Sequence, residues 1–164
     1  MIDFLSRLLG KKDEPSALAD ELDDSWVISS IASHSDFFRW LLQAVPENSI
    51  WSIDHVFDKK MLGTLMRFKS QSDHLKKGVF YINNAEINVL LSTEAKQAIL
   101  EKLDTWDFEA NAIHQRIYQN NTLYFVAYDN LHPLCTWLSL SFEKDEIKSL
   151  EKKGLIKFRH SQDG

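Results

Sequence analysis

The chain has 164 residues, of which 44% are hydrophobic, 26% are charged and 12% are aromatic. This composition predicts one folded domain with its own core and excludes a disordered chain. A disulfide scaffold is excluded because Cys135 is the single cysteine. The formal net charge of −5 disfavours binding to nucleic acid.

The chain is expected to be soluble and cytoplasmic. Its first apolar stretch contains Asp3 and Arg7, and a basic pair follows that stretch, whereas a secretory signal carries its positive charge in front. No apolar run approaches the roughly 20 residues that cross a bilayer, so we expect no membrane partner. A lone cysteine also suits a reducing compartment.

The first segment, residues 1–25, is expected to form an N-terminal amphipathic helical arm. Apolar residues recur at helical spacing from Ile2 to Leu9, and Gly10 is a typical stop signal. Six carboxylates follow before residue 26. The arm either packs on the rest of the domain or covers a partner.

The next segment, residues 26–160, is predicted to form an α+β core domain, with a flexible tail at 161–164. Its first strand is expected at 26–31, where β-branched and aromatic residues are common. Ser33 is a candidate N-cap for the apolar helix that follows, and Pro46 ends that helix.

A second strand is predicted at 49–56, followed by a helix that Asp58 can cap. Met61 and Leu65 share one face of this helix, as expected for core residues. A polar connector at 70–78 then separates the two halves of the domain.

Two β-hairpins are predicted, each with an Asn-Asn turn, because Asn tolerates the left-handed conformations of tight turns. One pairs residues 79–82 with 85–91, and the other pairs 112–119 with 122–129. Between them, Ser92 is the expected cap of a further helix.

The C-terminal part is predicted to contain a half-buried strand at 135–142, a charged helix at 143–153 and an edge strand at 155–159. Strands joined by tight turns pair antiparallel. The predicted fold is therefore a single α+β domain, with a mainly antiparallel sheet of about six to eight strands covered by helices on one face.

No established catalytic motif occurs in the sequence. The glycine-rich phosphate loops, the nucleophile elbow and the helical His-Glu-x-x-His motif are all missing, and the chain has only 5 glycines. Without paired cysteines or closely spaced histidines, we also expect no metal and no cofactor.

An enzymatic alternative rests on a polar segment between two predicted strands. Cys135 is the candidate nucleophile, His132 or His114 the candidate base, and Asp129 the group that orients the imidazole. The same residues are typical of an ordinary turn, so a small enzyme or ligand-binding domain is the second hypothesis.

Aromatic side chains suggest a binding surface. The candidate binding residues on one sheet face are Arg116, Tyr118, Tyr124, Tyr128 and Trp137. A shift of one residue in the strand register would move such side chains to the other face. The alternative is that these aromatic residues fill the core beneath the helices.

The first functional hypothesis is a non-enzymatic, acidic, protein-binding module. In size and charge the chain resembles small acidic immunity proteins, which act as antitoxin-like inhibitors; that resemblance implies a basic protein partner. A structural subunit of a homo-oligomer is the third hypothesis, because the strand at 155–159 is expected at a sheet edge.

Overall fold

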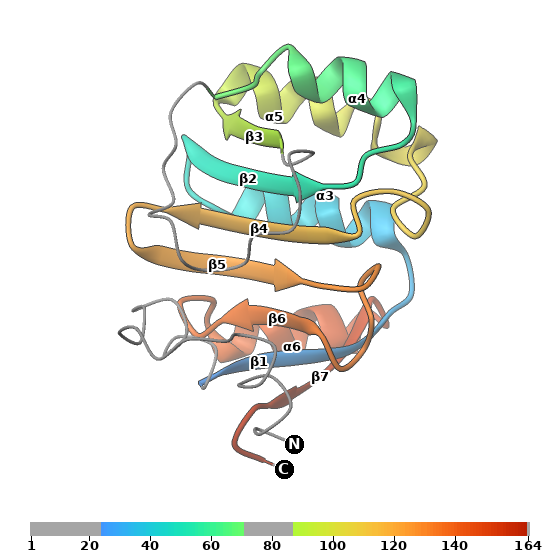
Figure 1. The fold of residues 1–164 in the computed structure, drawn as a ribbon. Helices are drawn as coiled ribbons and strands as arrows, with labels where there is room; N and C mark the ends of the chain where they lie inside the picture. The colour runs from blue at the N-terminus through green and yellow to red at the C-terminus, as the bar shows by residue number, and fades with distance from the viewer. Residues whose placement is uncertain (1–23, 71–86, 164) are drawn as a thin grey trace, which may run out of the picture.

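The computed structural model describes residues 24–70 and 87–163, which form one α+β domain (Figure 1). The predicted helical arm at 1–25 lies almost entirely outside the described residues, as does the first strand of the predicted hairpin 79–91. The strands are β1 (Ser25–Ile31), β2 (Ser49–Asp54), β3 (Ile87–Leu91), β4 (His114–Gln119), β5 (Thr122–Ala127), β6 (Thr136–Ser139) and β7 (Ile156–His160). The helices are α3 (His34–Ala44), α4 (Lys59–Met66), α5 (Thr93–Leu100) and α6 (Lys144–Lys152), with a 3-10 turn at Leu103–Thr105.

The strands form one seven-stranded sheet in the order β3-β2-β4-β5-β6-β1-β7, and every described pairing is antiparallel. The predicted sheet is therefore confirmed, and β7 lies at its edge. Figure 1 shows α3 and α6 behind the sheet, with α4 and α5 beyond β3. None of the helices within residues 24–70 and 87–163 lies over the near face of the sheet.

The predicted helix caps are confirmed. The side chain of Ser33 accepts a hydrogen bond from the backbone N–H of Asp36 at 3.2 Å, and Ser92 caps α5 in the same way. Asp58 Oδ1 accepts the backbone N–H of Met61 at 2.7 Å. Each bond satisfies a donor that the first turn of a helix leaves without a partner.

The predicted hairpin between β4 and β5 is confirmed, and its turn is the expected Asn-Asn pair. Gln119 pairs with Thr122, and Asn120 adopts a φ of 54°. The register shifts between Ile117 and Tyr118, whose partners are Phe125 and Leu123, so Tyr124 is an extra residue in β5. A shift of this kind changes which face the following side chains occupy.

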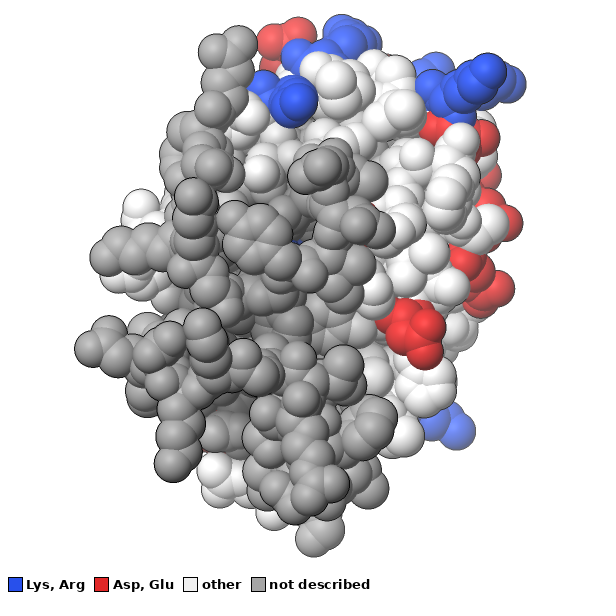
Figure 2. Space-filling model, viewed as in Figure 1, with Lys and Arg blue, Asp and Glu red and all other residues white. Residues whose placement is uncertain are grey.

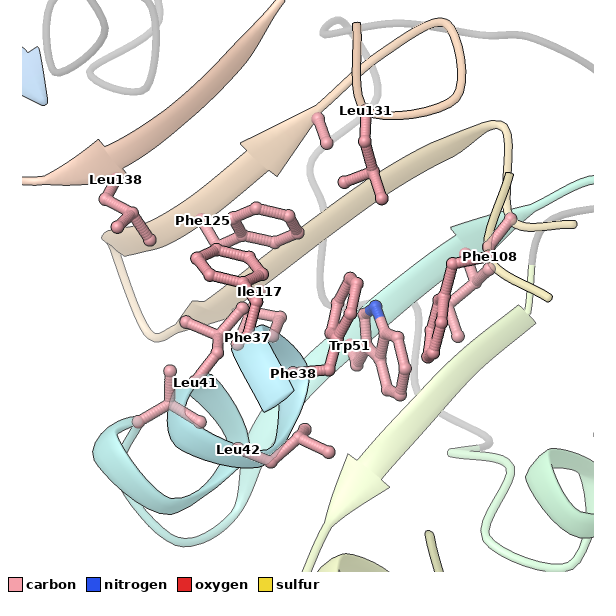
Figure 3. Close-up of a cluster of buried hydrophobic side chains, with 14 of the residues drawn as sticks. Phe37, Phe38, Leu41, Leu42, Trp51, Phe108, Ile117, Phe125, Leu131 and Leu138 are labelled. Atoms are coloured by element: carbon pink, nitrogen blue, oxygen red, sulfur yellow. The ribbon is translucent and has the colours of Figure 1, made fainter. Parts of the chain in front are cut away.

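The main core lies between the sheet and the helices, and aromatic rings fill its centre (Figure 3). The ring of Phe38 on α3 lies parallel to that of Phe108, with centroids 4.2 Å apart, and it also stacks near Trp51 of β2. Phe125 of β5 meets the same ring edge-on. Both arrangements are favoured for aromatic pairs, so Phe38 links α3 to two strands.

The residues after β7 remain attached to the sheet where they are described. The backbone N–H of Ser161 donates to the carbonyl of Ser25 at 2.8 Å, and the Ser25 N–H donates to the Ser161 hydroxyl at 3.0 Å. His160 Nε2 also lies 2.8 Å from Asp24 Oδ1. These contacts join both ends of the described chain.

Candidate functional site

Three connecting segments meet at one end of the sheet, on the right in Figure 1. They are residues 55–58 after β2, 107–113 before β4 and 128–135 between β5 and β6. We call them together the loop end. Function in β-rich proteins is often carried by such loops on a rigid sheet.

Backbone hydrogen bonds hold these segments to one another. The N–H of Ala112 donates to the carbonyl of His55 at 3.1 Å, and the N–H of Asn130 donates to the carbonyl of Ile113 at 3.1 Å. The buried side-chain oxygen of Asn111 accepts the backbone N–H of Phe57 at 2.8 Å. Hydrogen bonds therefore join the three segments of the loop end to one another.

The loop end exposes two large apolar side chains. Phe57 is 66% exposed and Leu134 is 64% exposed, more than any other large hydrophobic residue that the structure describes. Isolated apolar residues on a surface need no explanation, but these two belong to the same loop end.

A row of rings extends from Phe57 across the sheet. The ring of His55 lies 6.0 Å from Phe57 and 6.3 Å from His114, measured between centroids. Tyr128 follows at 5.5 Å from His114, and Trp137 of β6 lies 6.0 Å from Tyr128. The row connects the exposed Phe57 with the sheet face opposite the helices.

The loop end is acidic. Its three segments contain no Lys or Arg, and their exposed carboxylates are Asp58, Asp107, Glu109 and Asp129. Red carboxylate side chains gather along the right side of the space-filling view (Figure 2). Asp54, the last residue of β2, adds a buried carboxylate whose Oδ1 lies 2.8 Å from His55 Nδ1.

Left-handed backbone conformations are concentrated here. Five of the seven non-glycine residues with positive φ in the described ranges belong to the loop end, and their φ values run from 53° to 62°. They are His55, Ala112, Asp129, Asn130 and Leu131. Such conformations are unfavourable for most residues and persist where the surroundings hold them.

The candidate catalytic residues all lie at or beside the loop end, but the contacts among them are few. The backbone N–H of Asp129 donates to His114 Nδ1 at 3.4 Å. His132 Nδ1 accepts the N–H of Leu134 within its own turn. Among the described residues, no hydrogen bond or ion pair joins the Cys135 thiol to either imidazole.

The electrostatics of these groups also disfavour nucleophilic catalysis. Burial and, to a lesser degree, the nearby Asp129 carboxylate raise the pKa of the Cys135 thiol. Burial lowers the pKa of His114 most strongly, while the charges of Asp54 and Asp129 oppose this effect. A nucleophilic cysteine requires the reverse, a thiol pKa lowered by a cationic neighbour.

The candidate binding residues divide between the two sheet faces. Tyr118 packs in a small cluster on the face opposite the helices, with Tyr128 and Trp137 in or beside it. Arg116 is also on that face, because it alternates with Ile117 of the main core.

Tyr124 corrects the prediction of a shared face. It packs against the main core beneath the helices, with its ring 6.1 Å from that of Phe142. A bulge in β5 explains part of the discrepancy: Ile117 pairs with Phe125 and Tyr118 with Leu123, so Tyr124 is the extra residue and the alternation changes there. Tyr118 is itself buried, so the exposed part of this face is limited to its neighbours.

Phe57, Leu134 and Asn111 are the loop-end residues that the sequence analysis missed. The only available signal for Phe57 was an apolar residue between two carboxylates directly after a strand. Asn111 gave none, because its two backbone partners, Phe57 and Asp58, are 54 and 53 residues away.

A shallow groove of about 520 Å³ lies between α3 and α5, but its polar groups have partners within the protein. Lys96 Nζ donates to the carbonyl of Val45 at 2.6 Å, and burial lowers the pKa of this amine. Arg39 Nη2 donates to both carboxylate oxygens of Asp104, and Glu47 accepts from the backbone N–H of Thr93 at the start of α5. The charged groups of Lys96, Arg39 and Glu47 therefore take part in hydrogen bonds within the protein.

Within residues 24–70 and 87–163, no three His, Cys, Asp or Glu side chains are grouped as metal ligands. No helix in the same ranges is long and apolar enough to cross a membrane. Comparison of the chain with protein-family models, curated proteins and solved structures gives no match.

Proposed function

We propose that this protein is a non-enzymatic protein-binding module that presents its loop end to a basic surface on a protein partner. An inhibitor of the immunity or antitoxin kind is one form that such a module takes. The observation that carries the proposal is the exposure of Phe57 and Leu134 within a carboxylate-rich surface.

The apolar residues supply the attraction in this proposal. Protein interfaces bury a small number of large side chains at their centre, and most of the binding energy comes from them. Phe57 is well suited because Asn111 fixes its backbone, so little conformational freedom is lost on binding. The adjoining rings of His55 and His114 extend the aromatic surface.

The charges favour a basic partner. Asp58, Asp107, Glu109 and Asp129 are exposed in segments without Lys or Arg, so these segments carry a negative charge. A negative patch speeds association with a positive one and suppresses binding to other acidic proteins. The same charge disfavours nucleic acid as the partner.

The test is affinity capture from the native cell with the full chain, followed by quantitative mass spectrometry. The informative variant replaces both Phe57 and Leu134 with Ser. We expect the wild type to recover one basic protein at near-equal molar amounts, and the variant to recover at least about tenfold less. Capture should also weaken as salt is raised, because the attraction is partly electrostatic.

Leu140→Ser is the matched control. Leu140 is exposed like the other two residues, but it follows β6 at the opposite end of that strand from the loop end. Its replacement should leave capture unchanged. The proposal fails when no stoichiometric partner is recovered, or when the double variant captures the partner as well as the wild type does.

A further inference from the structure

Four of the five histidines that the structure describes lie at the loop end or against it. His55, His114 and His132 belong to its segments or begin the adjoining β4, and His34 at the start of α3 lies 3.8 Å from Glu109. The fifth, His160, is on β7. Histidine is the side chain whose charge changes most readily near neutral pH.

Two of these imidazoles act as hydrogen-bond acceptors for the β5–β6 loop, residues 128–135. His114 Nδ1 accepts the backbone N–H of Asp129 at 3.4 Å, and His132 Nδ1 accepts the backbone N–H of Leu134 at 3.2 Å. A ring nitrogen accepts only while it carries no proton. Both bonds therefore require the neutral imidazole.

The part of the loop between these two bonds has an unfavourable backbone. Asp129, Asn130 and Leu131 have consecutive φ values of 53°, 57° and 62°. Outside glycine such left-handed residues normally occur singly. A run of three needs contacts to hold it. They include the bond to His114 from outside the loop, the local bond to His132, and the backbone bond from Asn130 to the carbonyl of Ile113.

The charged groups around His114 act in both directions. Asp54 and Asp129 favour its protonated form, whereas His55 and Arg116 oppose it, as does burial. His55 itself lies against Asp54. His132 is exposed and, within the described residues, takes part in no ion pair.

We propose that the β5–β6 loop is a pH-sensitive element, held closed by neutral His114 and His132 and released when both imidazoles bind a proton at Nδ1. Protonation converts each acceptor into a donor that faces a backbone N–H, so each bond is lost. Released, the left-handed run relaxes and Leu134 changes its position.

The role of this loop in regulating binding rests on the proposed function. Protonation of these two imidazoles also adds positive charge to an acidic surface. Both effects weaken the attraction for a basic partner, so mildly acid solution should release it.

The experiment follows the backbone amides of Asp129 and Leu134 by NMR in the full chain without a partner. Hydrogen exchange, corrected for its intrinsic pH dependence, is compared at about pH 7.5 and about pH 5. We expect exchange at these two amides to be at least about tenfold faster, relative to the intrinsic rate, at the lower pH.

The double variant His114→Asn and His132→Asn separates the imidazoles from other titrating groups. Asn offers an acceptor oxygen near the position of Nδ1 but binds no proton in this range. The exchange difference should disappear in this variant. His160→Asn is the matched control, because His160 Nδ1 likewise accepts a backbone N–H, from Gln162 at 3.4 Å, outside the loop end.

The amide chemical shifts of the wild type are also followed from about pH 7.5 to about pH 3. Three results would overturn the inference: no change in wild-type exchange, the same change in the double variant, or chemical shifts of these two amides whose midpoint lies near pH 4, where carboxylates titrate. The last result is read from the wild type alone, so it decides the matter even when the double variant does not fold.

A separate binding measurement keeps the two proposals distinct. If the loop opens at low pH but affinity capture recovers no partner, the inference is supported and the proposed function is contradicted. A partner that binds a loop whose amides do not respond to pH supports the proposed function and overturns the inference.

Discussion

The side-chain oxygen of Asn111 accepts the backbone N–H of Phe57 at 2.8 Å, and that of Asp58 at 2.7 Å. One buried amide thus satisfies two donors at the turn between β2 and α4. Its own NH₂ group donates to the carbonyl of Asp107 at 3.0 Å. Through these bonds Asn111 fixes both the exposed Phe57 and the residue that caps α4.

Asn111→Ala should lower the free energy of unfolding by about 1–3 kcal/mol, because it leaves two partly buried backbone donors without an acceptor. Urea denaturation measures the effect. Asn121→Ala, in the exposed hairpin turn, is the control and should change stability by less than about 0.5 kcal/mol. Equal effects from the two variants would show that the Asn111 bonds do not stabilise the fold.

Phe38→Ala should lower the free energy of unfolding by about 3–5 kcal/mol, since it removes a fully buried ring from the centre of the core. Four ring contacts, to Phe37, Trp51, Phe108 and Phe125, are lost together. Phe57→Ala serves as the reference and should cost about 0.5 kcal/mol or less in the absence of a partner. A loss below about 1 kcal/mol for Phe38→Ala would contradict this description of the core.

The stability of the wild type should decrease in acid solution in a manner that His114→Asn reduces. Burial lowers the pKa of His114 in the folded state, while the unfolded value is about 6.5. The unfolded state therefore binds more protons in this window, so the contribution is complete above about pH 6.5 and is lost as the pH falls through the folded pKa.

Urea denaturation at several pH values measures this dependence. The free energy of unfolding of the wild type, relative to that of His114→Asn, should decline below neutral pH with a slope of at most about 1.4 kcal/mol per pH unit. The free energy of unfolding of the His160→Asn variant, relative to that of His114→Asn, should decline in the same way, because His114 is still present. Parallel curves for wild type and His114→Asn would refute the assignment.

Cys135 should react with iodoacetamide more slowly than a free thiol at neutral pH. The thiolate is the reactive form, and burial together with Asp129 raises the pKa of this thiol. Asp129→Asn removes the electrostatic part and should increase the rate, and Asn tolerates the left-handed backbone at this position. The protein unfolded in urea supplies the reference rate.

A rate above that of the unfolded reference would favour the enzymatic alternative, in which an imidazole activates Cys135. The observed contacts favour the slower rate, because no hydrogen bond or ion pair within the described ranges connects this thiol with His114 or His132.

Much of the fold was predictable because its signals are local. Ser33, Asp58 and Ser92 each cap a helix through a bond to a residue three positions ahead, so the cap and its helix are adjacent in sequence. The hairpin turn at Asn120 is likewise local. Alternating apolar residues identified the strands, although the exact ends differ by one to a few residues.

The candidate site was predictable only in part. The sequence analysis selected His114, Tyr128 and Trp137, which do belong to one row of rings. It assigned Tyr124 to the same face, because regular alternation was assumed and the bulge that Tyr124 forms in β5 was not visible. Such an irregularity is decided by how paired strands fit together, and its sequence signal is weak.

By itself, the sequence of this protein determined an acidic α+β domain, the positions of its described helices and strands, and the antiparallel pairing of β4 with β5. Those features depend on composition and on interactions within a few residues. Only the tertiary structure decided the strand order and the meeting of residues 55–58, 107–113 and 128–135. Contacts such as Asn111 with Phe57 join residues 54 positions apart, and their geometry follows from the packing of the whole sheet against its helices.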